Sequence, residues 1–488
     1  MSRRPLGLLA MGPLVILSLF VACDGLKRAD EPADAGGADG GGDEQTVEED
    51  GGGVQDGALG DSTPPDAGTP PVDFECPGDP WTKVAKTKPE CAPRQVKVIS
   101  AIAPLDVASI SIARTPAGRV GIVYNSEQGS DEGELHLVHF TPTTAAFAAP
   151  KLVKRATGLG LHDGYITRLT ASAPDTLAVL GYDRDDTDLG EVHLRKLVAG
   201  AEPLTDDLLV TAVKHPTELA VASDPAGNIY ATVRISTGVN VSKLSTWKKL
   251  AAGPFVPLVP EPLTGSLMPS QTPGVGSVSL FVDLGGQVHL LYPFNDGAIE
   301  PQHSIPRYHT LAATTWSARK TVDNGIIDGL SGYSPRIVVF GTKKYAAYFF
   351  RKAAQAVPQT ADLRLATWDA ALDTPQIEIL DQQIPSPEPV LYPAYQVAMA
   401  IDKYGLVHLA IIRPSSSGTL ALGVLEYRRQ IRVTGGGTKW LEDIVDPDVI
   451  SDGTSAYVDL VVDENARPHI AYSSAKDGHV KYATRFDR

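Results

Sequence analysis

The amino-acid sequence predicts an all-β fold: a seven-bladed β-propeller of four-stranded blades, closed by an N-terminal strand and preceded by a disordered stalk. Two observations carry this prediction. A unit of strand, short Asp/Gly turn and strand recurs seven times at a mean spacing near 58 residues, and the chain turns often, with 46 Gly and 38 Pro. A long fixed period with several short strands in each unit is typical of propeller blades.

The repeats occupy residues 95–488. Their first two strands are expected at 109–124, 167–182, 218–233, 277–292, 335–350, 396–411 and 457–472. The second strand of each unit is expected to begin at Val120, Leu177, Ile229, Val288, Tyr345, Val407 and Pro468. A chain of 488 residues would ordinarily form about three domains, but seven such units account for the whole body as one propeller.

The last repeat ends after its third strand. QVKVIS, residues 95–100, has the alternating apolar character of an outer strand and stands just before the first repeat. We expect it to complete the last blade, which closes the ring with strands from both ends of the body and removes the exposed edges.

The turn between the first two strands has a D-x-x-G pattern. The aspartates are Asp224, Asp283, Asp402 and Asp463, and glycines at the corresponding repeat position are Gly118, Gly227, Gly286 and Gly405. Asp accepts hydrogen bonds from nearby amides and Gly adopts positive φ, so the pattern predicts tight hairpins.

Three histidines also share one repeat position: His289, His408 and His469. A metal site is one interpretation. We favour the other, core histidines hydrogen-bonded to backbone groups, because the three residues belong to different blades whose faces are both covered.

The first 22 residues have the pattern of a secretory signal peptide. Arg3 and Arg4 precede an uncharged run that ends at Ala22, shorter than the ~20 residues of a spanning helix. Leu19-Phe20-Val21-Ala22-Cys23 resembles the lipobox of exported bacterial lipoproteins, although that family usually has Leu where Phe20 stands. The resemblance implies a lipid on Cys23 that binds a membrane outside the cytoplasm, in the outer membrane or at the cell surface of the bacterial envelope rather than in the inner membrane. An uncleaved anchor helix is the alternative.

Residues 23–75 form the predicted stalk. Positions 24–75 hold fifteen acidic residues against Lys27 and Arg28, with few large apolar side chains, so the segment is expected to stay disordered and extended. If Cys23 carries a lipid, the remaining cysteines, Cys76 and Cys91, are a pair, and an exported chain predicts a disulfide between them in a neck of residues 76–94.

The body from Cys76 onward has a net charge of only about −4, which excludes a broadly basic surface and therefore nucleic acid as the expected partner. No G-x-S-x-G, GxxxxGK[ST], HExxH or CxxC motif is present. We expect no cofactor and a monomer.

The repeats resemble a D-x-x-G-x-x-H-[IL]-x-Y…G-x-[LV]-x-Y unit of exported bacterial β-propellers, most closely in the last two repeats. Their style is distantly similar to that of sialidases, but S-x-D-x-G-x-x-W boxes are missing. The resemblance implies a fold and leaves the activity open.

One first-strand position places a side chain from each blade near the channel: Ser111, Arg168, Ala220, Ser279, Arg336, Ala398 and Asp459. Arg168 and Arg336 are expected to face each other across the ring. Three residues earlier stand Tyr165, Tyr333 and Tyr395. With Asp459 these groups predict a ligand site at the channel mouth that prefers an acidic sugar or a carboxylate-bearing peptide. The other interpretation, which we favour for these two residues, is that the arginines neutralise strand-end carbonyls and fill space.

An acidic loop offers a candidate calcium site with Asp183, Asp185, Asp186 and Asp188. Alternating carboxylates can ligate calcium, but Thr187 stands where a further ligand is expected and no Gly provides the sharp turn. We favour a solvated acidic loop.

The functional prediction is a lipid-anchored binding scaffold for a protein or a glycan, because the loops before the third strands and between blades are long and varied while the hairpin turns are short. The alternative is a carbohydrate-active hydrolase with catalytic groups at the channel mouth, which requires a suitably spaced pair of carboxylates.

Overall fold

The computed structural model describes the chain from Gln95 to Thr484 with internal gaps. The gaps are 101–108, 128–132, 142–145, 156–166, 173–174, 185–188, 199–204, 215–217, 239–240, 252, 259–277, 295–304, 313–314, 324–328, 353–358, 370–373, 387–395, 415–422, 434–436, 451–455, 475 and 477. The predicted signal peptide, lipid site, stalk and disulfide neck lie outside the described residues.

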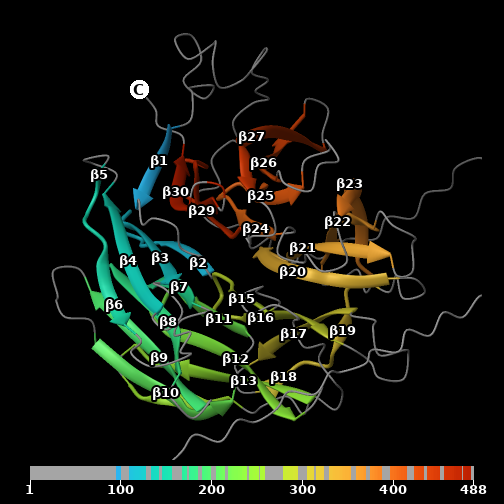
Figure 1. Cartoon of the computed structure of the whole chain (residues 1–488). Coiled ribbons are helices and arrows are strands. Elements are labelled where there is room, and N and C mark those ends of the chain that lie inside the picture. Colours follow the sequence, from blue (N-terminus) through green and yellow to red (C-terminus); the bar gives the residue numbers. More distant parts are fainter. Residues whose placement is uncertain are drawn as a thin grey trace, which may run out of the picture. The chain divides into compact units, whose positions relative to one another are not determined.

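Seven antiparallel sheets form a ring, as predicted (Figure 1). Blade 1 contains β2 (Ser109–Arg114), β3 (Val120–Glu127), β4 (Gly133–Thr141), β5 (Ala146–Phe147) and β6 (Lys151–Arg155). Blade 2 contains β7 (Thr167–Ser172), β8 (Thr176–Arg184), β9 (Leu189–Val198) and β10 (Thr205–Lys214). Blade 3 contains β11 (Glu218–Ser223), β12 (Ile229–Gly238), β13 (Val241–Lys249) and β14 (Phe255–Pro257). Blade 4 contains β15 (Ser279–Val282), β16 (Val288–Phe294), β17 (Ile305–Ala312), β18 (Thr315–Trp316) and β19 (Lys320–Thr321).

The remaining blades follow in chain order. Blade 5 contains β20 (Gly329–Phe340), β21 (Lys343–Lys352), β22 (Gln359–Trp368) and β23 (Gln376–Ser386). Blade 6 contains β24 (Gln396–Ile401), β25 (Val407–Pro414), β26 (Gly423–Arg432) and β27 (Thr438–Ile450). Blade 7 contains β28 (Val458–Val462), β29 (Pro468–Ser474), β30 (His479–Thr484) and β1 (Gln95–Ser100). The outer strand is divided in two in blades 1 and 4.

The D-x-x-G hairpins form for the reason the sequence suggests. Oδ1 of Asp402 accepts hydrogen bonds from the amides of Tyr404 and Leu406, both at 2.9 Å. Gly405 has φ 77°, and a Cβ there would approach the ring of Phe340 to 2.7 Å. Both the backbone conformation and the close approach therefore require glycine at this position.

The hydrophobic core is distributed between the blades. Each cluster of buried apolar side chains joins two neighbouring sheets, as where Ile110 and Tyr124 of blade 1 meet Tyr457 and Tyr482 of blade 7. A blade exposes two apolar faces and cannot bury either one alone, so the stability of each blade depends on both of its neighbours. This explains why the strands are apolar over long runs instead of alternating.

The ring closes as predicted, with strands from both ends of the described chain. β1 pairs with β30 in antiparallel register from Gln95 opposite Thr484 to Ser100 opposite Val480. On the inner side of the same junction, Oδ2 of Asp459 accepts hydrogen bonds from Ser111 Oγ at 2.7 Å and from the Ile112 amide at 3.0 Å. Blades 7 and 1 are thus joined at both the outer and the inner edge.

Within the described part of the chain, no helix is long and apolar enough to cross a membrane.

Deletion of residues 95–100 should destabilise the protein, because five residue pairs between β1 and β30 are lost. At roughly 1 kcal/mol for each backbone hydrogen bond, the free energy of unfolding should fall by several kcal/mol. Chemical denaturation measures this loss, and deletion of residues 24–75 is the control that should leave it unchanged. Equal stability of the two truncated chains would contradict closure by β1.

Candidate functional site

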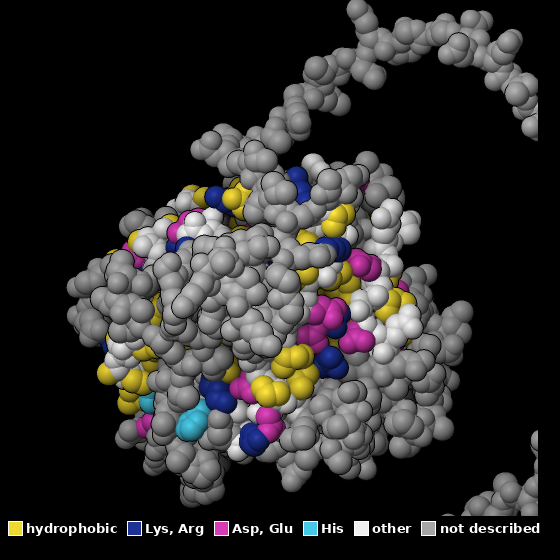
Figure 2. Space-filling view, turned by 90° about the horizontal axis from the view of Figure 1, so that it is seen from above, with side chains coloured by type: hydrophobic (Ala, Val, Ile, Leu, Met, Phe, Trp, Pro, Cys, Tyr) yellow, Lys and Arg dark blue, Asp and Glu magenta, His cyan; other side chains and the backbone are white. Residues whose placement is uncertain are grey.

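A cavity of about 1080 Å³ lies at the centre of the ring. First-strand residues from all seven blades line it, and its described wall continues to the hairpin turns at Gly285, Gly341 and Lys403. Figure 2, turned by 90° from the view of Figure 1, shows acidic, basic and apolar side chains interspersed over the described surface of that face. That described surface carries no uniformly basic patch.

Arg168 and Arg336 both line this cavity, as the repeat alignment predicts. Arg168 Nη1 donates to the carbonyl oxygen of Thr167 at 2.9 Å, and Arg336 Nη1 donates to that of Pro335 at 3.1 Å. The pKa of Arg336 is lowered to about 10, mainly by burial and also by the positive charge of Arg168, whereas Asp459 acts to raise it. Burial also lowers the pKa of Arg168. Both guanidinium groups remain protonated at neutral pH, so two like charges lie within electrostatic range of one another.

Asp459 lines the same cavity, but its carboxylate has structural partners. Besides its bonds to Ser111 and Ile112 of blade 1, it accepts a hydrogen bond from the Leu460 amide at 3.0 Å. The carboxylate therefore joins blade 7 to blade 1 while it also offsets part of the positive charge of the arginines.

Three tyrosines, Tyr165, Tyr333 and Tyr395, were predicted to surround the mouth of the channel. Tyr333 lies in β20, where its backbone is opposite Phe349, and its side chain is outside the described set. Tyr165 and Tyr395 lie outside the described residues altogether. The described cavity wall leads toward the hairpin turns, on the side away from the long loops, so the long-loop mouth stays a prediction.

Glu218 was not among the predicted site residues, and it is buried in an ion pair with Arg234 at 2.8 Å. Burial raises the pKa of Glu218 to about 7, although the charges of Arg234 and Arg168 act to lower it. Glu218 begins β11, and a charged residue at the start of an otherwise apolar first strand was the available signal. Its partner stands on β12 of the same blade, a pairing set by strand register.

The shared histidines form Asp–His–Tyr triads, each within one blade. His408 contacts the hydroxyl of Tyr427 through Nδ1 at 2.6 Å and the carboxylate of Asp402 through Nε2 at 3.2 Å.

His289 makes the same contacts with Tyr308 at 2.7 Å and Asp283 at 3.2 Å. His469 contacts Tyr482 at 2.5 Å, with Asp463 at 3.7 Å. The expectation of buried core histidines is confirmed. The expected partners were wrong, because turn aspartates and third-strand tyrosines take the place of backbone groups.

The acidic loop gives no calcium site among the described residues. Asp183 contacts Arg195 at 2.5 and 3.2 Å, so an arginine occupies the position of a cation. Asp185, Asp186 and Asp188 lie outside the described residues. In the part of the chain that is described, no group of three or more potential ligands is arranged to hold a metal ion.

The described cavity wall contains three carboxylates: Asp283, Asp402 and Asp459. All three accept backbone amide hydrogen bonds, and Asp283 and Asp402, in the hairpin turns, also contact the histidines of the following strands. Each is thus held by fixed structural partners within its own or the next blade.

No protein-family model matches the chain, and no curated protein is found to be similar in sequence. Several solved structures are similar in fold. A protein of unknown function from Dyadobacter fermentans is 12% identical with a TM-score of 0.44, over 81% of this chain and 98% of that one. An α-L-arabinanase of Penicillium chrysogenum, solved with arabinobiose, is 10% identical with a TM-score of 0.42, over 81% and 98%. The β-propeller domain of the Trilobed protease of Pyrococcus furiosus is 9% identical with a TM-score of 0.42, over 78% and 95%.

Replacement of Tyr427 by phenylalanine should destabilise blade 6, because Nδ1 of the buried His408 loses its partner. The expected decrease in the free energy of unfolding is about 1–3 kcal/mol. Chemical denaturation measures it, with Tyr404→Phe in the neighbouring turn as the control. EDTA should leave the melting temperature unchanged; a clear decrease with EDTA would support the metal interpretation of the histidines instead.

Proposed function

We propose that the chain is a binding module whose central cavity takes an anionic ligand, an acidic sugar or a carboxylate-bearing peptide. The presence of Arg168 and Arg336 in one cavity carries the proposal. Asp459 is the carboxylate beside them, and its hydrogen-bonding capacity is used by blade 1 and by Leu460. Two arginines and one aspartate leave a local excess of one positive charge, so an anion is preferred to a neutral ligand.

Burial strengthens this preference. Two like charges in a partly dry cavity repel one another, and the positive charge of Arg168 adds to burial in lowering the pKa of Arg336. An anion between them reduces that repulsion. A bidentate contact between a carboxylate and a guanidinium contributes about 1.5–3 kcal/mol to the binding free energy, or roughly ten- to a hundredfold in affinity.

The hydrolase alternative has less support. A glycosidase of the usual type needs two carboxyl groups across the bond to be cleaved, one of them available as a nucleophile or a base. Asp283, Asp402 and Asp459 each have fixed structural partners within the described wall. The cavity favours binding over acid–base chemistry.

The proposal includes the location that the N-terminal sequence suggests. A lipid on Cys23 would hold the protein to a membrane of the bacterial envelope, outside the cytoplasm. The acidic stalk up to residue 75 would separate the propeller from that membrane, and a Cys76–Cys91 disulfide would brace the start of the body. The propeller would act as a monomer without a cofactor.

The double substitution Arg168→Ala, Arg336→Ala should weaken anion binding about ten- to a hundredfold, because both guanidinium groups are lost. Trigalacturonic acid and its methyl ester are suitable probes, since esterification removes the charge and adds only methyl groups, and calorimetry measures their dissociation constants. The control is Arg119→Ala, Arg432→Ala, which removes two arginines from outside the described cavity wall. Unchanged affinity in a folded Arg168/Arg336 variant would place the site elsewhere.

Cys23→Ser should move the exported protein from the membrane fraction to the soluble fraction, because the sulfur that carries the lipid is replaced. Immunoblotting of the two fractions measures the change. Persistence of the variant in membranes at the wild-type level would favour the uncleaved anchor helix.

A further inference from the structure

The wall between the arginines and the hairpin turns is apolar. In four neighbouring blades, the residues that come after the arginine position of the first strand are apolar and line the cavity. They are Leu280–Val282, Ile337–Phe340, Met399–Ile401 and Leu460–Val462. At about 3.3 Å for each residue, a run of three covers about 10 Å of the depth of the cavity. On these four blades the cavity therefore has an apolar length next to its two arginines, and charged residues line it again near the turns, namely Arg114, Asp283, Asp402 and Lys403.

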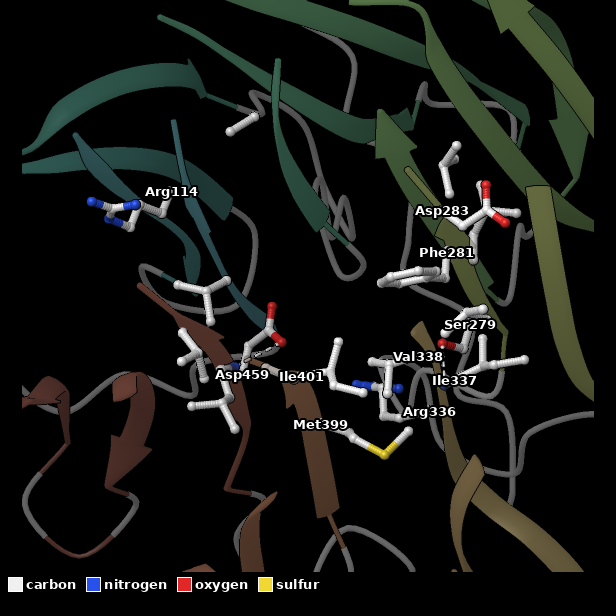
Figure 3. Close-up of a pocket in the computed structure, with 18 of the residues that line it drawn as sticks. Arg114, Ser279, Phe281, Asp283, Arg336, Ile337, Val338, Met399, Ile401 and Asp459 are labelled. Atoms are coloured by element: carbon white, nitrogen blue, oxygen red, sulfur yellow. Dashed lines mark hydrogen bonds between the residues drawn. The ribbon is translucent and has the colours of Figure 1, made fainter. Parts of the chain in front are cut away.

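Several of these side chains are covered only in part. Phe281, Ile401 and Val462 are half-buried although they belong to innermost strands. Figure 3 shows Phe281, Met399 and Ile401 around the same space as Arg336 and Asp459. At the hairpin-turn end, Leu284 lines the cavity with 79% of its surface exposed. This is the highest exposure of any large hydrophobic residue in the described part of the chain. Apolar surface that faces an open cavity is a feature of ligand and partner sites.

An acidic sugar would use only one of these two features. Its carboxylate would meet the arginines, but its hydroxyl groups would lie against valine, isoleucine and phenylalanine side chains and lose hydrogen bonds to water. A ligand with a carboxylate at one end and an apolar body would use both, since the body displaces water from the wall.

We propose that the ligand of the central cavity is an amphiphilic carboxylate, such as a medium-chain fatty acid. Its carboxylate lies at Arg168 and Arg336, and its apolar body runs along β15, β20, β24 and β28 toward Leu284. This inference rests on the proposed function, because it assigns the class of ligand to the same arginines. It keeps the anion of the proposed function but names an amphiphile in place of the sugar or peptide, and it places this ligand in the central cavity instead of at the long-loop face.

The test uses the full chain with Cys23→Ser, so that no acyl group of its own competes for the cavity. Calorimetry gives dissociation constants for decanoate, acetate, decan-1-ol and trigalacturonic acid. Decanoate should bind at least about tenfold more tightly than acetate, which has the charge without the chain, and than decan-1-ol, which has the chain without the charge. Arg168→Ala, Arg336→Ala should reduce decanoate binding to the level of decan-1-ol.

Two wall variants test the apolar body. Leu284→Ser at the exposed turn and Phe281→Ser in β15 should each weaken decanoate binding about fivefold or more and leave acetate binding unchanged. Leu208→Ser on the outer strand β10 is the matched control, because Leu208 is 47% exposed and lies outside the described cavity wall.

The outcomes separate the two proposals. Tight trigalacturonate binding with equal affinities for decanoate and acetate would overturn the amphiphile and leave the anion site standing. Equal affinities for decanoate and decan-1-ol would overturn the role of the arginines in holding the head group. If no carboxylate binds in the folded protein, the anion site itself is overturned.

Discussion

The closure between the last and the first blade is the constraint on which the rest of the structure depends. Each blade buries its faces only against its neighbours, so an open ring would leave one face of blade 1 and one of blade 7 in water. β1 therefore pairs with β30 at the outer edge, while Phe140 of blade 1 packs on Tyr482 of blade 7 with ring centroids 5.1 Å apart. Asp459 ties the inner edge to Ser111 and Ile112.

The same inner position has different roles in successive blades. The hydroxyl oxygens of Ser111 and Ser279 accept hydrogen bonds from the backbone amides of Leu169 and Ile337 in the next blade, each at 3.1 Å. The arginines stand in the blades that follow these serines, and an arginine has no acceptor with which to continue such a link. Arg168 and Arg336 line the cavity and donate to the carbonyl oxygens of Thr167 and Pro335. One layer of side chains holds blades together at three junctions and supplies the two arginines of the cavity.

The histidine triads show how a repeat motif is used inside a blade. The aspartate forms the turn through its amide contacts, and its second oxygen faces the histidine at the second position of the next strand. The tyrosine of the third strand completes the contact, so the hairpin turn, the second strand and the third strand are joined by side chains as well as by backbone hydrogen bonds. In blade 7 the tyrosine is Tyr482, which also packs against Phe147 of blade 1 with ring centroids 5.2 Å apart. The triad and the ring closure are thus connected through one side chain.

The sequence alone was enough to predict the number of blades, the hairpin turns and the strand that closes the ring, because these depend on local periodicity and turn chemistry. Val120, Ile229, Val288, Val407 and Pro468 begin second strands as the alignment predicted. It was also enough to place Arg168, Arg336 and Asp459 in one layer, since equivalent residues of a repeat occupy equivalent places around the axis. Only the tertiary structure decided what those residues contact. The hydrogen bonds of Asp459 to blade 1, the pairing of each histidine with a tyrosine and the partly exposed apolar wall arise between segments far apart in the chain, where strand register and blade packing set which side chains meet.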